Sequence, residues 1–116
     1  MTGPSGRGRF LLVYATTASE VEAARIAEAL LRERLVACAQ VFPVASRYWW
    51  KGKIEKSREY GMILKTRKGL YRKVEAKIKA LHSYSVPAIV AWELAAGSRA
   101  FLEWLQQETR AGNRPR

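Results

Sequence analysis

The sequence predicts an α+β fold of βαββαβ order, with two helices on one face of a four-stranded antiparallel sheet and a further helix at the C-terminal end. Three observations support this. Apolar residues recur at helical spacing in three stretches, β-branched and aromatic residues dominate four others, and a Lys-Gly pair joins two long β-prone stretches. Right-handed crossovers convert this order into the ferredoxin-like sandwich, which leaves one sheet face without helices. We expect a second subunit to cover that face.

The first strand and the first helix follow each other near the N-terminus. Phe10 to Ala15 is a short apolar run, as expected for a strand covered on both faces. Ser19 precedes Glu22 by three residues, the spacing of a capping box, so a helix is expected to begin there. It is expected to extend to Arg34 through an apolar face made by Ala23, Ile26, Ala27, Leu30 and Leu31.

A long β-hairpin follows. Its predicted arms are residues 36–50 and 53–66, and Lys51-Gly52 is expected to form a two-residue turn between them. Strands average about 5 to 6 residues, so such arms must either project from the domain or bend at a bulge, for which Pro43 is the natural place. A projecting arm leaves Tyr48, Trp49 and Trp50 in water unless another chain covers them. We therefore predict an oligomer with these three aromatic residues at its interface.

The remaining elements complete the βαββαβα order. A helix is expected over residues 70–81, because Leu70, Tyr71, Val74, Ile78 and Leu81 share one face. Residues 86–94 form the predicted last strand, with Pro87 near its start. Ser98 is expected to cap a terminal helix whose apolar positions are Phe101, Leu102, Trp104 and Leu105.

Length and composition indicate one small domain over residues 10–109, flanked by basic tails, 1–9 and 110–116, that we expect to be disordered. No apolar run is long enough to span a membrane, and residues 2–9 lack the apolar stretch of a secretory signal. Cys38 is the single cysteine, so nothing in the sequence requires an oxidising compartment. These features predict a cytoplasmic protein without a membrane partner.

The charge is strongly positive. Lys and Arg number 21 against 10 acidic residues, all of them Glu, for a net charge of +11. Polyanions are attracted to such a surface, but no aromatic-basic RNA signature or recognition helix accompanies it, so we read the basic helix face (Arg72, Lys73, Lys77 and Lys79) as solvated and nucleic acid as a disfavoured partner. Enzymatic catalysis also has little support, because the chain has one histidine, no aspartate and no phosphate-binding loop.

Several motifs in order resemble the CutA divalent-cation-tolerance family. The run from Glu33 to Gln40 looks like the exit of that family's first helix and its cysteine-bearing strand. Lys65-Thr66 resembles the end of its third strand, and Leu81-His82-Ser83-Tyr84-Ser85-Val86-Pro87 is similar to its Leu-His-Pro-Tyr-x-x-Pro-Glu signature. The likeness spans about residues 10–109 and includes, at the expected spacing, Ser46, Tyr48, Trp50, Gly52, Ile54, Glu59, Gly97 and the helix from Phe101 to Leu105.

The resemblance implies a homotrimer of ferredoxin-like subunits with clefts between neighbouring chains, tolerance to divalent cations, and binding of copper or another divalent cation. It also leaves a role for protein partners. The sequence departs from the family pattern at Ser83, where Pro is usual, and at Ala88, where Glu is usual. Lys56, Ser57 and Arg58 replace a typically acidic patch, which disfavours attraction of cations to that surface.

The candidate metal ligands are Cys38, His82 and Glu59. A thiolate suits copper in its monovalent state, and histidine is the commonest metal ligand. The alternative for Cys38 is a small buried apolar residue, and for His82 a helix C-terminal residue that interacts with free carbonyls.

A second set of candidates, Trp50, Lys65 and Tyr84, is expected in the intersubunit cleft with Glu59 and His82, where it would hold a small anionic or zwitterionic ligand. The alternative is structural, with Trp50 and Tyr84 as interface anchors and Lys65 paired with Glu59. Three functions remain open: a metal-binding trimer, a ligand-sensing trimer that acts on protein partners, and a nucleic-acid-associated protein. The first is favoured on the resemblance.

Overall fold

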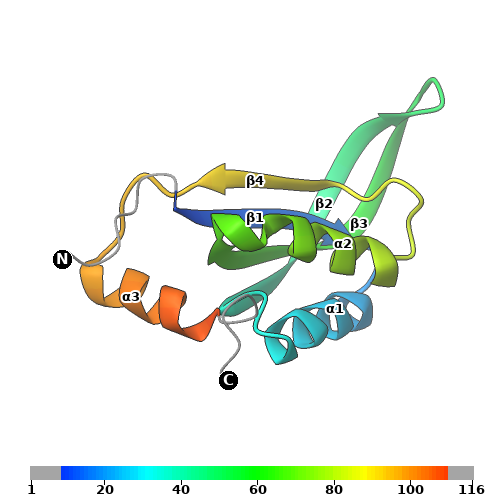
Figure 1. Cartoon of the computed structure of the whole chain (residues 1–116). Helices are drawn as coiled ribbons and strands as arrows, with labels where there is room; N and C mark the ends of the chain where they lie inside the picture. Colours follow the sequence, from blue (N-terminus) through cyan, green and yellow to red (C-terminus); the bar gives the residue numbers. More distant parts are fainter. Residues whose placement is uncertain (1–8, 110–116) are drawn as a thin grey trace.

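Four strands and three α-helices make up the fold of residues 9–109, the part of the chain that the computed structural model describes (Figure 1). The sheet order is β2-β3-β1-β4 with antiparallel neighbours, which confirms the predicted ferredoxin-like fold. The tails predicted to be disordered lie outside the described residues, except for Arg9. In chain order the elements are β1 (Phe10–Thr17), α1 (Glu20–Arg32), β2 (Cys38–Trp50), β3 (Lys53–Arg67), a short 3-10 helix (Lys68–Leu70), α2 (Tyr71–Leu81), β4 (Ile89–Glu93) and α3 (Arg99–Glu108).

Local signals set both ends of α1. Ser19 caps the helix as predicted, because its Oγ accepts a hydrogen bond from the Glu22 backbone N–H at 3.1 Å. The helix ends before the expected Arg34, which adopts a left-handed conformation with φ of 60°. The Arg34 N–H donates to the Leu31 carbonyl and the Leu35 N–H to the Leu30 carbonyl, the two bonds of a Schellman motif.

The hairpin turn is the predicted Lys51-Gly52 pair. Both residues have positive φ, 51° and 80°, as a type I′ turn requires. The ladder then runs without a bulge from Trp50 opposite Lys53 to Cys38 opposite Lys65. The arms therefore project, and the bulge considered at Pro43 is absent, because β2 is an edge strand in which a missing N–H is tolerated.

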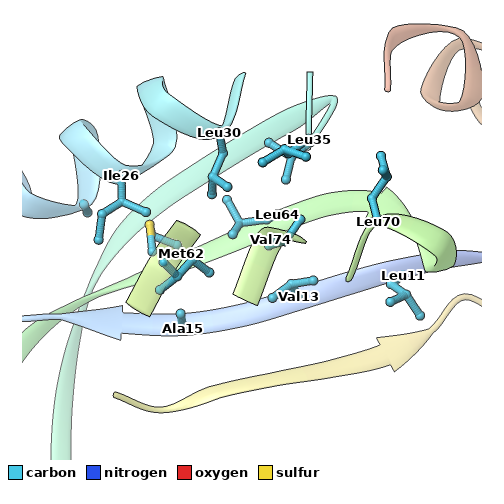
Figure 2. Close-up of a cluster of buried hydrophobic side chains, with 13 residues drawn as sticks. Leu11, Val13, Ala15, Ile26, Leu30, Leu35, Met62, Leu64, Leu70 and Val74 are labelled. Atoms are coloured by element: carbon cyan, nitrogen blue, oxygen red, sulfur yellow. The ribbon is translucent and has the colours of Figure 1, made fainter. Parts of the chain in front are cut away.

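The main core lies between the sheet and the helices α1 and α2 (Figure 2). Side chains alternate along β1, and Leu11, Val13 and Ala15 point to this core. Met62 and Leu64 of β3 share the same face. The helices contribute Ala23, Ile26, Leu30, Val74 and Ile78, all with no exposed surface.

The opposite side of the sheet, which we call the open face, is only partly covered. Phe10 points to this face and is buried by Leu102 and Leu105 of α3, which lies at the end of the sheet away from the hairpin (Figure 1). Ser98 caps α3 as predicted, since its Oγ accepts from the Phe101 N–H. Beyond α3, the open face keeps an aromatic row in which Tyr14 contacts Phe42 and Trp92 at ring-centroid distances of 6.4 and 6.3 Å.

The segment before β4 differs from the prediction. The strand was expected to begin at Val86, but it begins at Ile89, and residues 82–88 form a loop. Side-chain and backbone hydrogen bonds from this loop to β1, β3 and α1 replace sheet pairing there. Among residues 9–109, no helix is long and apolar enough to cross a membrane.

Candidate functional site: the groove beside Glu59 and Tyr84

A groove of about 750 Å³ lies on the open face between the hairpin and the loop 82–88. Strand alternation explains its lining, because alternate residues of the three adjacent strands point to the same face. The lining residues on this face are Tyr14 and Thr16 of β1, Ser46, Tyr48 and Trp50 of β2, and Glu59 of β3; Ala45 and Arg47 of β2 also border the groove. The loop closes one side with Tyr84, Ser85, Val86 and Ala88.

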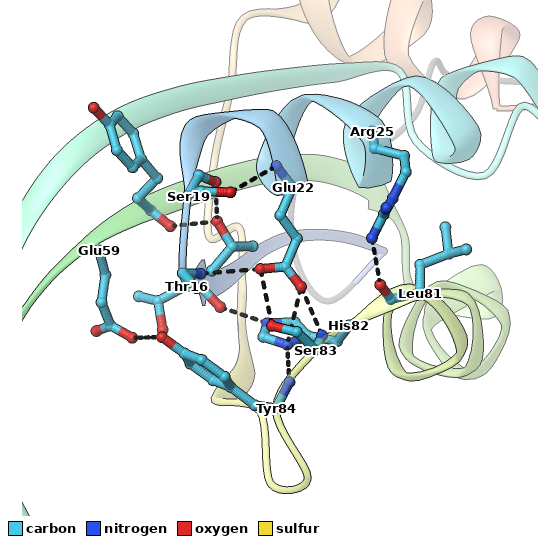
Figure 3. Close-up of polar contacts among 12 residues, drawn as sticks. Thr16, Ser19, Glu22, Arg25, Glu59, Leu81, His82, Ser83 and Tyr84 are labelled. Carbon is cyan, nitrogen blue, oxygen red and sulfur yellow. Dashed lines mark hydrogen bonds and ion pairs between the residues drawn. The ribbon is translucent and has the colours of Figure 1, made fainter.

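Glu59 and Tyr84 meet inside this groove. The Tyr84 hydroxyl donates a 2.8 Å hydrogen bond to Glu59 Oε2 (Figure 3). Burial and this hydrogen bond to the carboxylate raise the pKa of Tyr84, so the phenol stays protonated and remains a donor at neutral pH. The pair joins the loop to β3, and Glu59 is only 6% exposed although it stands on the open face.

His82 is held from both ring nitrogens. Its Nδ1 accepts a hydrogen bond from the Tyr84 backbone N–H at 3.0 Å, so Nε2 carries the proton and donates to the Thr16 carbonyl at 2.7 Å. The His82 side chain has no exposed surface. Coordination of a metal would break one of these two bonds. We therefore favour a structural role for His82. Its partner is the Thr16 carbonyl of β1 and not the helix carbonyls that we expected.

Glu22 connects helix α1 to the same loop. Its carboxylate accepts from the Ser83 N–H at 2.6 Å, from the Ala18 N–H at 3.0 Å and from the Ser83 hydroxyl at 3.2 Å (Figure 3). Burial opposes the ionisation of Glu22, but these hydrogen bonds outweigh it and lower the pKa of the carboxyl. A proline at position 83 would lack both of these donors.

Cys38 and Lys65 lie at the other end of the open face. They face each other in the β2–β3 ladder, and Lys65 Nζ donates to Gln40 Oε1 at 3.1 Å. Lys65 and Glu59 are six residues apart on β3, or about 20 Å at ~3.3 Å per residue. Within one protomer, Lys65 therefore neither pairs with Glu59 nor lines the groove.

The three candidate metal ligands do not converge within one protomer. Cys38 lies near Lys65, His82 is enclosed behind the loop, and Glu59 accepts from Tyr84. No group of three or more His, Cys or Glu side chains within residues 9–109 is arranged to hold a metal ion. The donor set of a single protomer does not fit a metal centre, and metal binding through these residues stays a prediction.

The predicted interface aromatics do not share one face. Tyr48 and Trp50 point to the open face and line the groove, whereas Trp49 points to the other side of the hairpin, opposite Ile54. Trp49 is 72% exposed.

Glu22 is a residue of the site that the sequence did not indicate: its spacing from Ser19 indicated only a helix cap, and no local signal pointed to Ser83.

Comparison with known proteins identifies the family. The family model described as CutA1 divalent ion tolerance protein matches residues 11–108. The curated divalent-cation tolerance protein CutA of Archaeoglobus fulgidus is 43% identical over 95 residues, which cover 82% of this chain and 93% of that protein. The CutA of Pyrococcus horikoshii is 41% identical over 100 residues, which cover 86% and 98%.

Solved structures agree with these matches. The periplasmic divalent cation tolerance protein CutA from Archaeoglobus fulgidus has a TM-score of 0.85 at 41% identity, covering 86% of this chain and 98% of that one. CutA1 from Oryza sativa has a TM-score of 0.86 at 34% identity, covering 91% and 98%. Because the family model spans nearly all described residues and the fold agrees, the chain belongs to the CutA1 divalent ion tolerance protein family.

Proposed function

We propose that this protein works as a homotrimer in the response to divalent cations, by binding rather than by catalysis. One observation supports an oligomer: the part of the open face that α3 does not cover presents large apolar side chains. Trp92 is 55% and Val90 49% exposed there, and Tyr14 and Phe42 continue the same surface. An apolar patch of this kind on a small soluble protein marks an interaction site, and a symmetric copy offers a matching surface.

Metal binding is supported by the divalent-cation tolerance names of the relatives. Because the donors of one protomer do not converge, we propose that a metal would use donors from more than one subunit. We propose Cys38 as one of these donors, because it is half-buried rather than fully enclosed and because a thiolate favours monovalent copper.

The test is an anaerobic titration with monovalent copper against a competing chelator, with the assembly mass measured in the same sample. We expect binding in the wild type and its loss in Cys38→Ser at unchanged mass. Glu28→Gln serves as the comparison variant, because Glu28 is a solvent-exposed carboxylate of α1 that is not a candidate ligand. Equal copper affinity in the wild type and Cys38→Ser would reject this ligand assignment.

A second candidate function is the sensing of a small organic ligand and its communication to protein partners. The groove beside Glu59 and Tyr84 favours it, because concave sites with aromatic walls and a few polar groups are typical of ligand sites. The predicted cleft residues Trp50 and Tyr84 line this groove, and Lys65 does not. Ligand-dependent stabilisation that is abolished by Glu59→Gln would support it; a thermal-shift screen without any stabilising compound would count against it.

A further inference from the structure

We propose that the groove beside Glu59 and Tyr84 binds an organic cation, a small molecule that carries an ammonium group. This inference rests on the second candidate function above and reverses the ligand charge that the sequence predicted. The anionic or zwitterionic ligand depended on Lys65, which does not line the groove and lies six residues along β3 from Glu59, roughly 20 Å away. Without Lys65, the buried charge of the groove is the carboxylate of Glu59.

The carboxylate has one oxygen available. Glu59 Oε2 accepts from the Tyr84 hydroxyl, whereas Oε1 accepts no hydrogen bond from residues 9–109. No buried side-chain oxygen or nitrogen in the described chain lacks a partner, so Oε1 must reach solvent in the groove although the residue as a whole is buried. A partly desolvated carboxylate with a free oxygen attracts a cation more strongly than an exposed one does.

Tyrosine rings lie on both sides of this carboxylate: Tyr84 donates to Glu59, and Tyr14 and Tyr48 each stand about four residues along the ladder from it. Tyr14, Tyr48, Trp50 and Tyr84 all line the groove. The faces of such rings carry negative potential and attract ammonium groups, most strongly for Trp. Trp50 lies six residues along β2 from the partner of Glu59, roughly 20 Å away, and Lys51 Nζ already lies 5.9 Å from its ring centroid, so the rings beside Glu59 are those of the tyrosines. Rings combined with a carboxylate are therefore complementary to a quaternary or methylated ammonium group rather than to an anion.

The basic residue nearest to the groove does not cancel this preference. Arg47 is among the lining residues, but it lies between Ser46 and Tyr48 on β2, so its side chain leaves from the opposite face of the hairpin. Its cross-strand neighbour there is Lys56. Arg47 and Lys56 thus point away from Glu59, whereas Lys53 shares its face but stands six residues along β3, roughly 20 Å away.

The experiment is a titration of the assembled protein with choline, followed by the backbone amide signal of Tyr84 in NMR and by calorimetry. The matched probe is the neutral carbon analogue of choline, in which carbon replaces the quaternary nitrogen, and acetate is the anionic probe. We expect choline to bind about tenfold more tightly than its carbon analogue, which is the discrimination that a desolvated cation–π site provides. Acetate is expected to cause no shift at Tyr84.

Two variants locate the effect. Glu59→Gln keeps the shape of the groove and is expected to remove most of the preference for choline. Glu55→Gln is the control, because Glu55 points to the same face of β3, opposite Tyr48, but does not line the groove. The inference would be overturned if choline and its carbon analogue bound equally, or if acetate bound more tightly than choline. It would also be overturned if Glu59→Gln kept the preference, or if choline caused no shift because a neighbouring subunit fills the groove. Because Cys38 is distant, the copper titration succeeds or fails independently of these results.

Discussion

At the scale of single residues, Glu22 has the largest structural role in the site. It accepts three hydrogen bonds, and two of them come from Ser83, whose position in the chain is 61 residues away. The pair fixes the loop that carries His82 and Tyr84 against the start of α1. Arg25 adds a second link, since it donates to the Leu81 carbonyl at the end of α2. The wall of the groove is therefore positioned from helix α1.

The lowered pKa of Glu22 makes this link dependent on pH. A carboxyl whose pKa is lower in the folded than in the unfolded state contributes stability above its ordinary pKa of 4.5, and this contribution is lost as pH falls through the folded-state value. We expect Glu22→Gln to lower the free energy of unfolding at neutral pH by about 1–3 kcal/mol, as for hydrogen bonds to a charged group, and to flatten its decrease below about pH 4.5. Denaturant unfolding from neutral to acid pH measures both effects.

The control is Glu28→Gln, because Glu28 is a solvent-exposed residue of the same helix that pairs only with Arg32. It should follow the wild-type pH dependence closely. An acid limb of unchanged slope in Glu22→Gln would show that Glu22 does not carry this dependence.

At the scale of elements, the turn and the helix ends were predictable because their signals are local. Ser19, Ser98 and Lys51-Gly52 each specify a cap or a turn within a few residues, and all three act as predicted. The loop 82–88 was not predictable in this way, because contacts with distant residues replace strand pairing there. The separation of Lys65 from Glu59 could have been found from the sequence, since six residues of a strand span about 20 Å.

The hairpin turn offers a direct test of backbone conformation. Gly52 has φ of 80°, and a Cβ there would meet no atom within 4 Å, so Gly52→Ala changes only the backbone preference. We expect it to lower the free energy of unfolding by about 1 kcal/mol. Gly69→Ala is the matched control: space is equally open there, but φ is not positive, so the variant should be neutral or slightly stabilising. Equal effects of the two variants would contradict a type I′ turn.

At the scale of the whole molecule, the arrangement of layers leaves one face of the sheet only partly covered. Helices α1 and α2 bury one face of the sheet, whereas α3 covers only the end of the other near Phe10. The sequence predicted this asymmetry from the order of elements, and it predicted exposed aromatics on the hairpin. Alternation along the strand already separates Trp49 from Tyr48 and Trp50, and the register with β3 decides which side is the open face. Trp49 is thus left outside the open face.

The central claim is that copies of the chain cover the open face, and the mass of the assembly in solution tests it most directly. We predict a mass of three times the 13.1 kDa chain by light scattering for the wild type, and dissociation in Trp92→Lys, which places a charge in the aromatic row. Val21→Lys, at an exposed apolar residue of α1, should leave the mass unchanged. A wild-type mass of one chain, or a trimer that persists in Trp92→Lys, would contradict the account.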